Sequence, residues 1–232
     1  MKKSVDFSIV FPVMNQADHI ERVIRAHHGI LTRHKISFEL IAMVNGSRDT
    51  SYQVCKKIAK KLASVSTYEL KESGYGLGVL HGLKQTTGKY LCYANSARVH
   101  SDELLRCIKF FLKDPNTVLY AARKKRDVWY RRFSSLIYNG FCTLFMGISS
   151  SDINGTPKIF KRSIYKKLNL QFTNSMIDVE FFDKIKRFAI PVKEFPIYRN
   201  TRHGGVSTSR FSTIFRLIKE VIHYWYMTRI RH

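Results

Sequence analysis

The first half of the chain alternates short apolar runs with longer amphipathic segments. Three apolar runs have the length of strands, and they cover residues 7–13, 38–44 and 90–94; residues 67–70 are a further short strand candidate. Between the first three of these four stretches in chain order, residues 17–31 and 50–63 carry apolar side chains at helical spacing. Strands that alternate with helices are typical of a parallel sheet with crossover helices, so the pattern predicts an α/β protein.

The second half of the chain is less regular. We expect a strand at residues 118–122, an apolar segment at 129–148, a helix and then a strand within 175–200, and a final helix at 211–232. No internal repeat, low-complexity segment or domain linker interrupts this order. The chain is therefore predicted to form one domain, with residues 1–210 as its body and residues 211–232 as a C-terminal amphipathic helix.

The composition adds a strong positive charge to this picture. The 232 residues include 40 Lys and Arg against 17 Asp and Glu, and the formal net charge is +23. A charge of this size favours anionic partners such as phosphates, nucleic acid or an acidic membrane surface, without choosing among them. No helix-turn-helix, zinc-finger or RRM signature supports nucleic-acid binding, so no specific nucleic acid is expected.

The cysteines and the hydropathy indicate the redox compartment and whether the chain has a membrane-spanning segment. The four cysteines show no CxxC spacing, so buried free thiols in a reducing compartment are favoured over a metal site or a disulfide. No stretch offers 18 uninterrupted apolar residues, and the apolar run at residues 7–13 is too short and interrupted for a signal peptide. We expect neither a transmembrane helix nor a leader.

Two segments could meet a membrane surface. Residues 211–232 place apolar side chains along one helical face and Arg and Lys elsewhere, and residues 129–148 are apolar with two arginines. Packing against the domain is the commoner explanation for such a stripe. A basic amphipathic helix can also lie on an anionic membrane, so peripheral association on the cytoplasmic face is the second expectation.

Polar residues follow the predicted strands. Asn45-Gly46-Ser47 comes after residues 38–44, and Asn95-Ser96-Ala97 comes after residues 90–94. In parallel α/β sheets, ligands bind at the carboxyl ends of the strands. The glycines between Gly74 and Gly82 match neither a dinucleotide-binding loop nor a Walker loop, so a glycine-eased turn is at least as good an explanation as a phosphate cradle.

The motifs gain specificity from their order. In sequence they are Pro12-x-x-Asn15, Asn45-Gly46-Ser47-x-Asp49, Gly76 with Gly82, Asn95-x-Ala97, Asp152 with Lys158, Asp178-x-Glu180 and Arg202-x-x-Gly205-x-Ser207. Over residues 8–209 this series resembles the family 2 glycosyltransferases of GT-A fold, above all those like dolichyl-phosphate mannosyltransferase and the bacterial polyprenyl-phosphate glycosyltransferases. The resemblance implies a single GT-A (Rossmann-like) domain with a mostly parallel central sheet flanked by helices.

The resemblance also implies a function and a site. It implies transfer of a sugar, with inversion, from a nucleotide-sugar donor to polyprenyl phosphate or a glycan. The donor-binding residues it implies are Pro12, Asn15, Asn45, Gly46, Asp49, Gly76, Asn95, Lys158 and Ser207. Asp178 would orient the acceptor and Arg202 would contact the donor phosphates. The structural alternatives are a carboxylate that complements a helix dipole for Asp178 and a solvated loop charge for Arg202.

The chain departs from the family where a metal is expected. The family carries Asp-x-Asp at the strand end where this chain has Asn95 and Ala97, and that motif holds a divalent cation on the donor diphosphate. Asn95 is neutral and Ala97 has no ligand atom, so we expect no metal site, and Mg²⁺ or Mn²⁺ only if other ligands replace the carboxylates. Lys158, Arg199 and Arg202 are the cations that could stabilise the diphosphate instead. The competing hypothesis is a catalytically silent GT-A module that binds a nucleotide sugar, a lipid or a protein.

Overall fold

The computed structural model describes residues 5–124, 129–199, 201–204 and 211–230. The strands of the sheet are β1 (Phe7–Val13), β2 (Phe38–Asn45), β3 (Val65–Leu70), β4 (Tyr90–Tyr93), β5 (Val118–Arg123), β6 (Lys158–Lys161) and β7 (Val192–Ile197). The helices are α1 (Ile20–Arg33), α2 (Ser51–Ala59), α3 (Tyr75–Lys84), α4 (Ser101–Phe111), α5 (Trp129–Met146), α6 (Arg162–Leu168), α7 (Ile177–Arg187) and α8 (Phe211–Arg229).

The seven strands form one sheet in the order β3-β2-β1-β4-β6-β5-β7. β1 pairs in parallel with β2 and β4, β2 with β3, and β5 with β7, whereas β6 runs antiparallel to both of its neighbours. All seven residues of β1 are buried, which explains why its sequence is apolar apart from Ser8 rather than alternating. The prediction of a single α/β domain with a mostly parallel sheet is confirmed.

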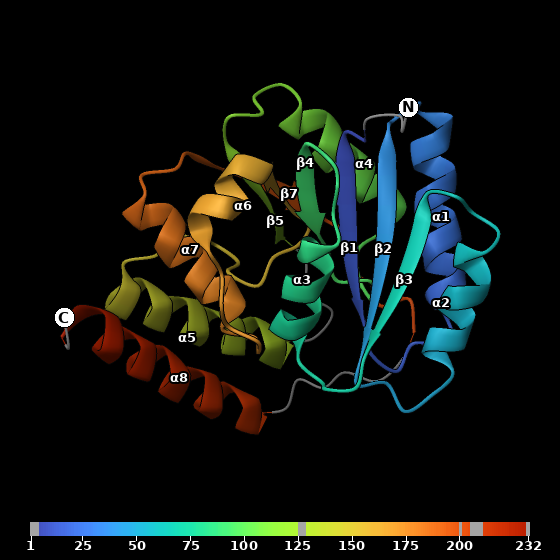
Figure 1. Cartoon of the computed structure of the whole chain (residues 1–232). Helices are drawn as coiled ribbons and strands as arrows, with labels where there is room; N and C mark the ends of the chain where they lie inside the picture. The colour runs from blue at the N-terminus through green and yellow to red at the C-terminus, as the bar shows by residue number, and fades with distance from the viewer. Residues whose placement is uncertain (1–4, 125–128, 200, 205–210, 231–232) are drawn as a thin grey trace.

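Helices cover both faces of the sheet (Figure 1). Ile9 and Phe11 of β1 join the core formed with α1, α2 and α4, while Val10 joins the core formed with α3, α5, α6, α7 and α8. This division follows from the period of two along a strand, which sends successive side chains to opposite faces. The two cores hold the three-layered α/β arrangement together.

Two parts of the fold differ from the sequence reading. The glycine-rich segment, expected as a loop that opens into a helix, is helical from Tyr75 onwards, and Gly76 lies so close to the carbonyl oxygens of Phe172 and Asn174 that a Cβ atom would collide with both. The antiparallel strand β6 was not predicted, and neither was α6. Glycine in α3 therefore serves close packing of backbone on backbone, which outweighs its poor helix propensity.

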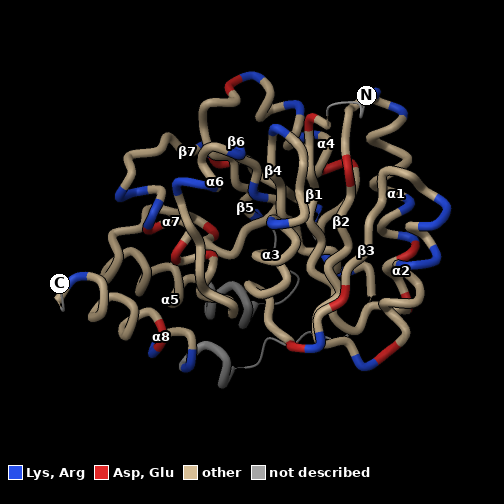
Figure 2. Tube along the Cα trace, viewed as in Figure 1, with Lys and Arg blue, Asp and Glu red and all other residues tan. Residues whose placement is uncertain are grey.

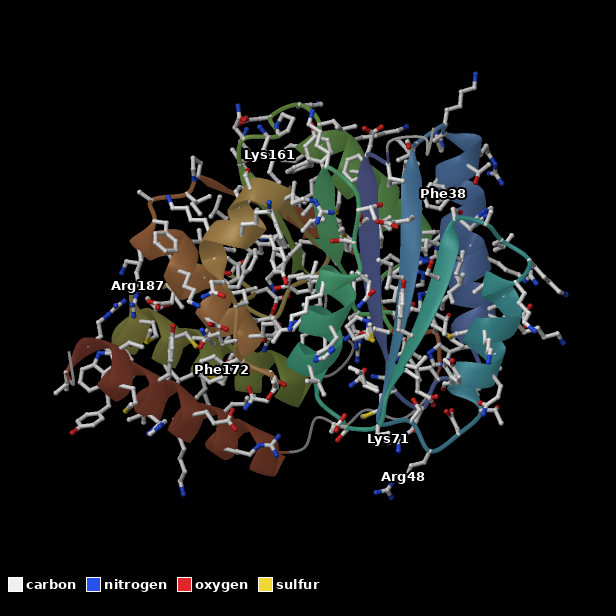
Figure 3. The ribbon with its side chains drawn as sticks, in the orientation of Figure 1. Phe38, Arg48, Lys71, Lys161, Phe172 and Arg187 are labelled. Carbon is white, nitrogen blue, oxygen red and sulfur yellow. The ribbon has the colours of Figure 1, made fainter. Side chains whose placement is uncertain are left out.

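The carboxyl ends of the parallel strands lie together at one end of the sheet. In Figure 3, Arg48 and Lys71, which follow β2 and β3, lie at this end, and Phe38, the first residue of β2, lies at the other. Lys161 also lies at the other end because β6 runs in the opposite direction. The predicted site residues that follow β1, β2 and β4 are consequently neighbours.

The charge and the helices bear on the membrane expectation. Figure 2 shows Lys and Arg spread over several elements, among them α1, α2 and α7. α5 and α8 pack side by side, and none of the helices within the described residues is both long and apolar enough to span a bilayer. All four cysteines are buried free thiols.

Candidate functional site

The loop after β1 is bound to the loop after β2. Asn15 has a left-handed backbone, with φ of 52°; its Oδ1 accepts the N–H of Arg48 at 2.8 Å and its N–H donates to Ser47 Oγ at 3.1 Å. Gln16 N–H donates to Ser51 Oγ at 2.8 Å. Gly46 has φ of 61° and lies against the backbone of Ser73, a place that only glycine fits without strain. These bonds fix both loops at the strand ends.

Asp49 lies just before α2 and joins the two loops. Its carboxylate accepts the N–H groups of Ala17 and Ser51, each at 3.0 Å, together with the Ser51 hydroxyl. Partial burial acts to raise the pKa of Asp49, but the hydrogen bonds from Ser51 and Ala17 outweigh it and the pKa lies below its ordinary value. Asp49 is therefore ionised at neutral pH and acts here as a clamp between the loops.

Asn45 lies between β1 and the start of α3. Its Nδ2 donates to Gly74 O at 2.9 Å, and its buried Oδ1 faces Gly78, where an added Cβ would lie 2.8 Å from that oxygen. The same Cβ would lie 3.1 Å from Pro12, so Pro12 and Asn45 flank one point of α3. Among the described residues, no donor reaches Asn45 Oδ1.

The residues that follow β4 form a turn and are hydrogen-bonded to β1 and the loop after it. Asn95 Oδ1 accepts the N–H of Ala97 at 3.1 Å, which makes a turn directly after the strand. The buried Ser96 hydroxyl lies 2.9 Å from Pro12 O and 2.8 Å from Gln16 Oε1. Pro12, Asn45 and Asn95 thus lie at the carboxyl ends of three adjacent strands, as the pattern of strand ends predicted.

This strand end does not fit a hard divalent cation. Asn95 is neutral and its oxygen already accepts a hydrogen bond, while Ala97 is 3% exposed and presents only a methyl group. Hard cations prefer carboxylate oxygens. In the part of the chain that the structure describes, no group of three His, Cys, Asp or Glu side chains is arranged to hold a metal ion.

The 201–204 segment lies on the turn after β4. His203 N–H donates to Ala97 O at 2.9 Å, and its ring Nε2 donates to Val99 O at 2.9 Å. Arg202, predicted to contact phosphate, belongs to this segment and its Nε donates to Gly204 O at 3.1 Å. Ser207, predicted for the same loop, lies outside the described residues. Arg202 therefore lies on a segment whose backbone is bound to the turn after β4.

Lys158 and Asp178 lie beneath the end of β4. Lys158 Nζ donates to Asp178 Oδ1 at 2.7 Å and to the carbonyls of Ile153 and Gly155 at 3.0 Å each, and the Tyr93 hydroxyl donates to the same Asp178 oxygen at 2.9 Å. Both charged side chains are buried. Burial lowers the pKa of Lys158, and the Asp178 carboxylate opposes that shift. A contact of Lys158 with a donor would have to replace one of these bonds.

A second ion pair lies next to the first. Arg123 binds Asp152 through two hydrogen bonds, Nε to Oδ2 at 2.6 Å and Nη2 to Oδ1 at 2.7 Å. The pKa of Arg123 is raised: burial acts against the charged form, but Asp152 outweighs it, and Asp178 and Tyr75 add to its effect. Sequence reasoning singled out Asp152 but not Arg123. Its position as the last residue of β5 was the available signal.

Sequence reasoning also missed Ser96, Tyr93 and His203. Ser96 stood in the quoted strand-end motif, where its hydroxyl could have been considered a link to β1. The signal for His203 was its place directly after Arg202. No local pattern marked Tyr93, which reads as an ordinary apolar strand residue. The roles predicted for Gly76, Lys158 and Asp178 stay predictions, and the structure places these residues among backbone contacts and buried ion pairs.

Known proteins match most of this sequence. The model of the family described as "Glycosyl transferase family 2" matches residues 8–169. An undecaprenyl-phosphate 4-deoxy-4-formamido-L-arabinose transferase of Edwardsiella ictaluri is 20% identical over 225 residues, which are 95% of this chain and 68% of that protein. Its namesake in Pseudomonas savastanoi is 22% identical over 160 residues, or 68% of this chain and 48% of the relative. The chain therefore spans between about half and two thirds of these relatives.

Solved structures share the fold. Mannosyl-3-phosphoglycerate synthase from Rubrobacter xylanophilus superposes with a TM-score of 0.74 at 14% identity, covering 98% of this chain and 74% of its own. Glucosyl-3-phosphoglycerate synthase from Mycobacterium tuberculosis, solved with Mn²⁺, UDP and phosphoglyceric acid, superposes with a TM-score of 0.71 at 14% identity. The match covers 96% of this chain and 78% of that structure's chain. Identities this low establish the GT-A fold alone. The match of the family model over well above half of the sequence goes further: the chain belongs to glycosyltransferase family 2.

Proposed function

We propose that the protein transfers a sugar from a nucleotide-sugar donor to a phosphate oxygen of a polyprenyl phosphate. The proposal rests on one observation. Pro12, Asn45 and Asn95 lie together at the carboxyl end of the sheet, and Arg202 belongs to a segment that packs against the turn after β4. The names of the curated relatives, which act on undecaprenyl phosphate, support the acceptor class. The neighbour solved with UDP supports a nucleotide-linked donor.

The reaction needs little proton chemistry with this acceptor. An acceptor phosphate oxygen attacks the anomeric carbon from the side opposite the leaving group, the bond from that carbon to the donor phosphate breaks, and a nucleoside diphosphate leaves. Because a phosphate acceptor is already anionic, it requires no general base. Attack from the opposite face inverts the anomeric configuration. The buried Asp178 is consistent with this scheme, since it is paired with Lys158 and has no need to remove a proton.

The leaving diphosphate must be stabilised by this chain's cations. The relatives of known structure include one solved with Mn²⁺ and UDP, but the end of β4 in this chain offers Asn95 and Ala97 where a cation would need carboxylates. Fixed cations placed where negative charge develops can lower a barrier as a metal does. Arg202 is the residue that we assign to this task, and no step of the proposed reaction passes through a metal.

A silent binding module is the second candidate. The observation that favours it is the same loss of carboxylates. A GT-A domain without the two Asp-x-Asp carboxylates at the end of β4 could bind a donor and release it unchanged. The deciding experiment incubates the protein with a nucleotide-sugar panel that includes UDP-glucose, with undecaprenyl phosphate in detergent, and follows the nucleoside diphosphate released. Acceptor-dependent release supports transfer, whereas donor binding without release supports the silent module.

We also propose that the α5–α8 face rests on a membrane surface. Leu144 of α5 is 78% exposed, Ile222 and Tyr226 of α8 are exposed, and Lys219 lies exposed on α8. Apolar side chains beside basic ones suit an anionic bilayer. Replacing Leu144 and Tyr226 by Asp should reduce sedimentation with phosphatidylglycerol vesicles, and high salt should weaken binding of the unaltered protein. Equal recovery of both proteins with these vesicles would contradict the assignment.

A further inference from the structure

The 201–204 segment is anchored on both sides of Arg202. On one side, Thr201 O accepts the ring Nε2–H of His100 at 3.1 Å. On the other side, His203 N–H donates to Ala97 O at 2.9 Å. The backbone at residue 202 is therefore held between two points of the turn that follows Asn95.

His203 makes most of the contacts that hold the segment. Its ring Nε2 donates to Val99 O at 2.9 Å, and its ring centroid lies 4.3 Å from that of His100. Its carbonyl accepts Nη2 of Arg22 at 2.8 Å. One side chain and its peptide groups thus join the turn after β4, the start of α4 and the exposed side of α1.

The next residue shows how closely the segment fits. A Cβ added to Gly204 would lie 2.6 Å from Asp18 Oδ2 and 2.7 Å from His19 Nδ1, closer than real Cβ contacts allow. Glycine at this position lets the backbone lie directly on the start of α1. The segment is held by α1 on one side and by the turn after β4 on the other.

We propose that His203 is a positioning residue for sugar transfer, which fixes Arg202 over the strand end that lacks the metal-binding carboxylates. This inference rests on the proposed function, because the importance of Arg202 derives from it. A segment ordered during folding does not have to be ordered again when the donor binds, and that saving strengthens binding. It matters most where a fixed guanidinium, and not a metal, must meet the diphosphate.

The chemistry of the anchor suggests discriminating variants. The bond to Val99 requires only one N–H donor on the ring, so the neutral imidazole is sufficient. Burial lowers the pKa of His203, the hydrogen bond to Val99 opposes this shift, and the nearby His100, His19 and Arg22 add to the lowering, so the ring is neutral at pH 7.5. His203→Gln retains a side-chain N–H of similar reach, whereas His203→Ala retains none.

The first measurement needs neither donor nor activity. Amide hydrogen exchange at pH 7.5 should show protection of residue 203 in the unaltered protein, loss of that protection in His203→Ala and in Gly204→Ala, and partial recovery in His203→Gln. His34→Ala, an exposed histidine at the end of α1, is the matched control and should change nothing in this segment. Unchanged exchange in His203→Ala would overturn the anchoring role.

The second measurement tests positioning through a double-mutant cycle with UDP-glucose binding as the readout. Arg202→Ala and His203→Ala should each weaken binding about tenfold, and the double variant should be no weaker than Arg202→Ala alone, because the two residues act as one unit. His203→Gln should recover most of the affinity. Additive losses would show that His203 acts independently of Arg202 and would overturn the proposal. If the unaltered protein binds no nucleotide sugar, the proposed function fails, while the exchange experiment still decides the anchoring.

Discussion

Lys158 and Asp178 form a buried ion pair in which Nζ lies 2.7 Å from Oδ1, and both side chains are almost fully excluded from solvent. Lys158 is the first residue of β6 and Asp178 lies in the first turn of α7, so the pair ties the antiparallel strand to the helix behind it. Removing one partner of a buried pair leaves the other charge without compensation. The pair therefore makes a sharp test of the packing beneath the site.

We predict that Lys158→Met and Asp178→Leu each reduce the free energy of unfolding by about 3–5 kcal/mol. The double variant should lose less than the sum, because it leaves no unpaired charge. Urea denaturation followed by circular dichroism measures all three. Lys124→Met, which breaks the exposed pair with Glu194, is the control and should have a much smaller effect. Additive losses in the double variant would contradict the pairing.

The response to metal ions distinguishes this chain from relatives that carry Asp-x-Asp. Because Asn95 and Ala97 do not fit a divalent cation, EDTA should leave nucleotide-sugar binding by the unaltered protein essentially unchanged. Asn95→Asp combined with Ala97→Asp should make binding depend on Mn²⁺ if the turn keeps its shape. Isothermal titration calorimetry with and without chelator measures both effects. Loss of binding by the unaltered protein on chelation would show that other ligands form a metal site.

Arg202 should matter for the donor and not for the fold. A charge-assisted contact with phosphate is worth about 1.5–3 kcal/mol, so Arg202→Ala should weaken donor binding about tenfold or more. The midpoint of thermal unfolding should move little because Arg202 is only partly buried. Arg25→Ala on α1, which removes an exposed arginine paired with Glu21, is the matched control. Equal donor affinity of the Arg202 and Arg25 variants would remove Arg202 from the site.

The 201–204 segment should loosen as the pH falls below about 6.5. The charged or titratable groups that face His100 and His203 are Asp18, His19, Arg22 and His27 on or before α1, Asp102 and Glu103 on α4, and Arg199. Burial lowers the pKa of both rings, so each takes up a proton less readily when the segment is bound than when it is free. The bound form is therefore favoured above the ordinary histidine pKa of about 6.5 and loses its advantage below it.

Amide exchange of residues 201–204 between pH 7.5 and pH 5.5, corrected for intrinsic exchange, measures this loosening. Each histidine can weaken the bound form by at most about tenfold per pH unit. A variant with His100→Gln should show a shallower dependence, because one of the two titrating groups is gone. Protection that does not change over this range would rule out the titration of the two rings as a cause.

The strands show why part of the fold could be read from the sequence. β1 is buried along its whole length and β2 from Leu40 onwards, so both sequences are largely apolar, and polar residues mark where the strands end. β6 is only four residues long and has lysine at both ends, so nothing in its own sequence identified it. Its antiparallel pairing is decided by β4 and β5, which lie far away in the chain.

The sequence by itself determined the α/β class, the family and the end of the sheet at which Pro12, Asn45 and Asn95 lie. It could do so because buried strands and their polar ends produce local patterns of apolar and polar residues. Only the tertiary structure decided which groups are paired there. It joined Asp178 to Lys158 and bound His203 to the carbonyl of Val99, 104 residues earlier in the chain. A local pattern records whether a side chain is buried, but the partner of a buried charge or hydrogen-bond donor is fixed only when distant segments pack together.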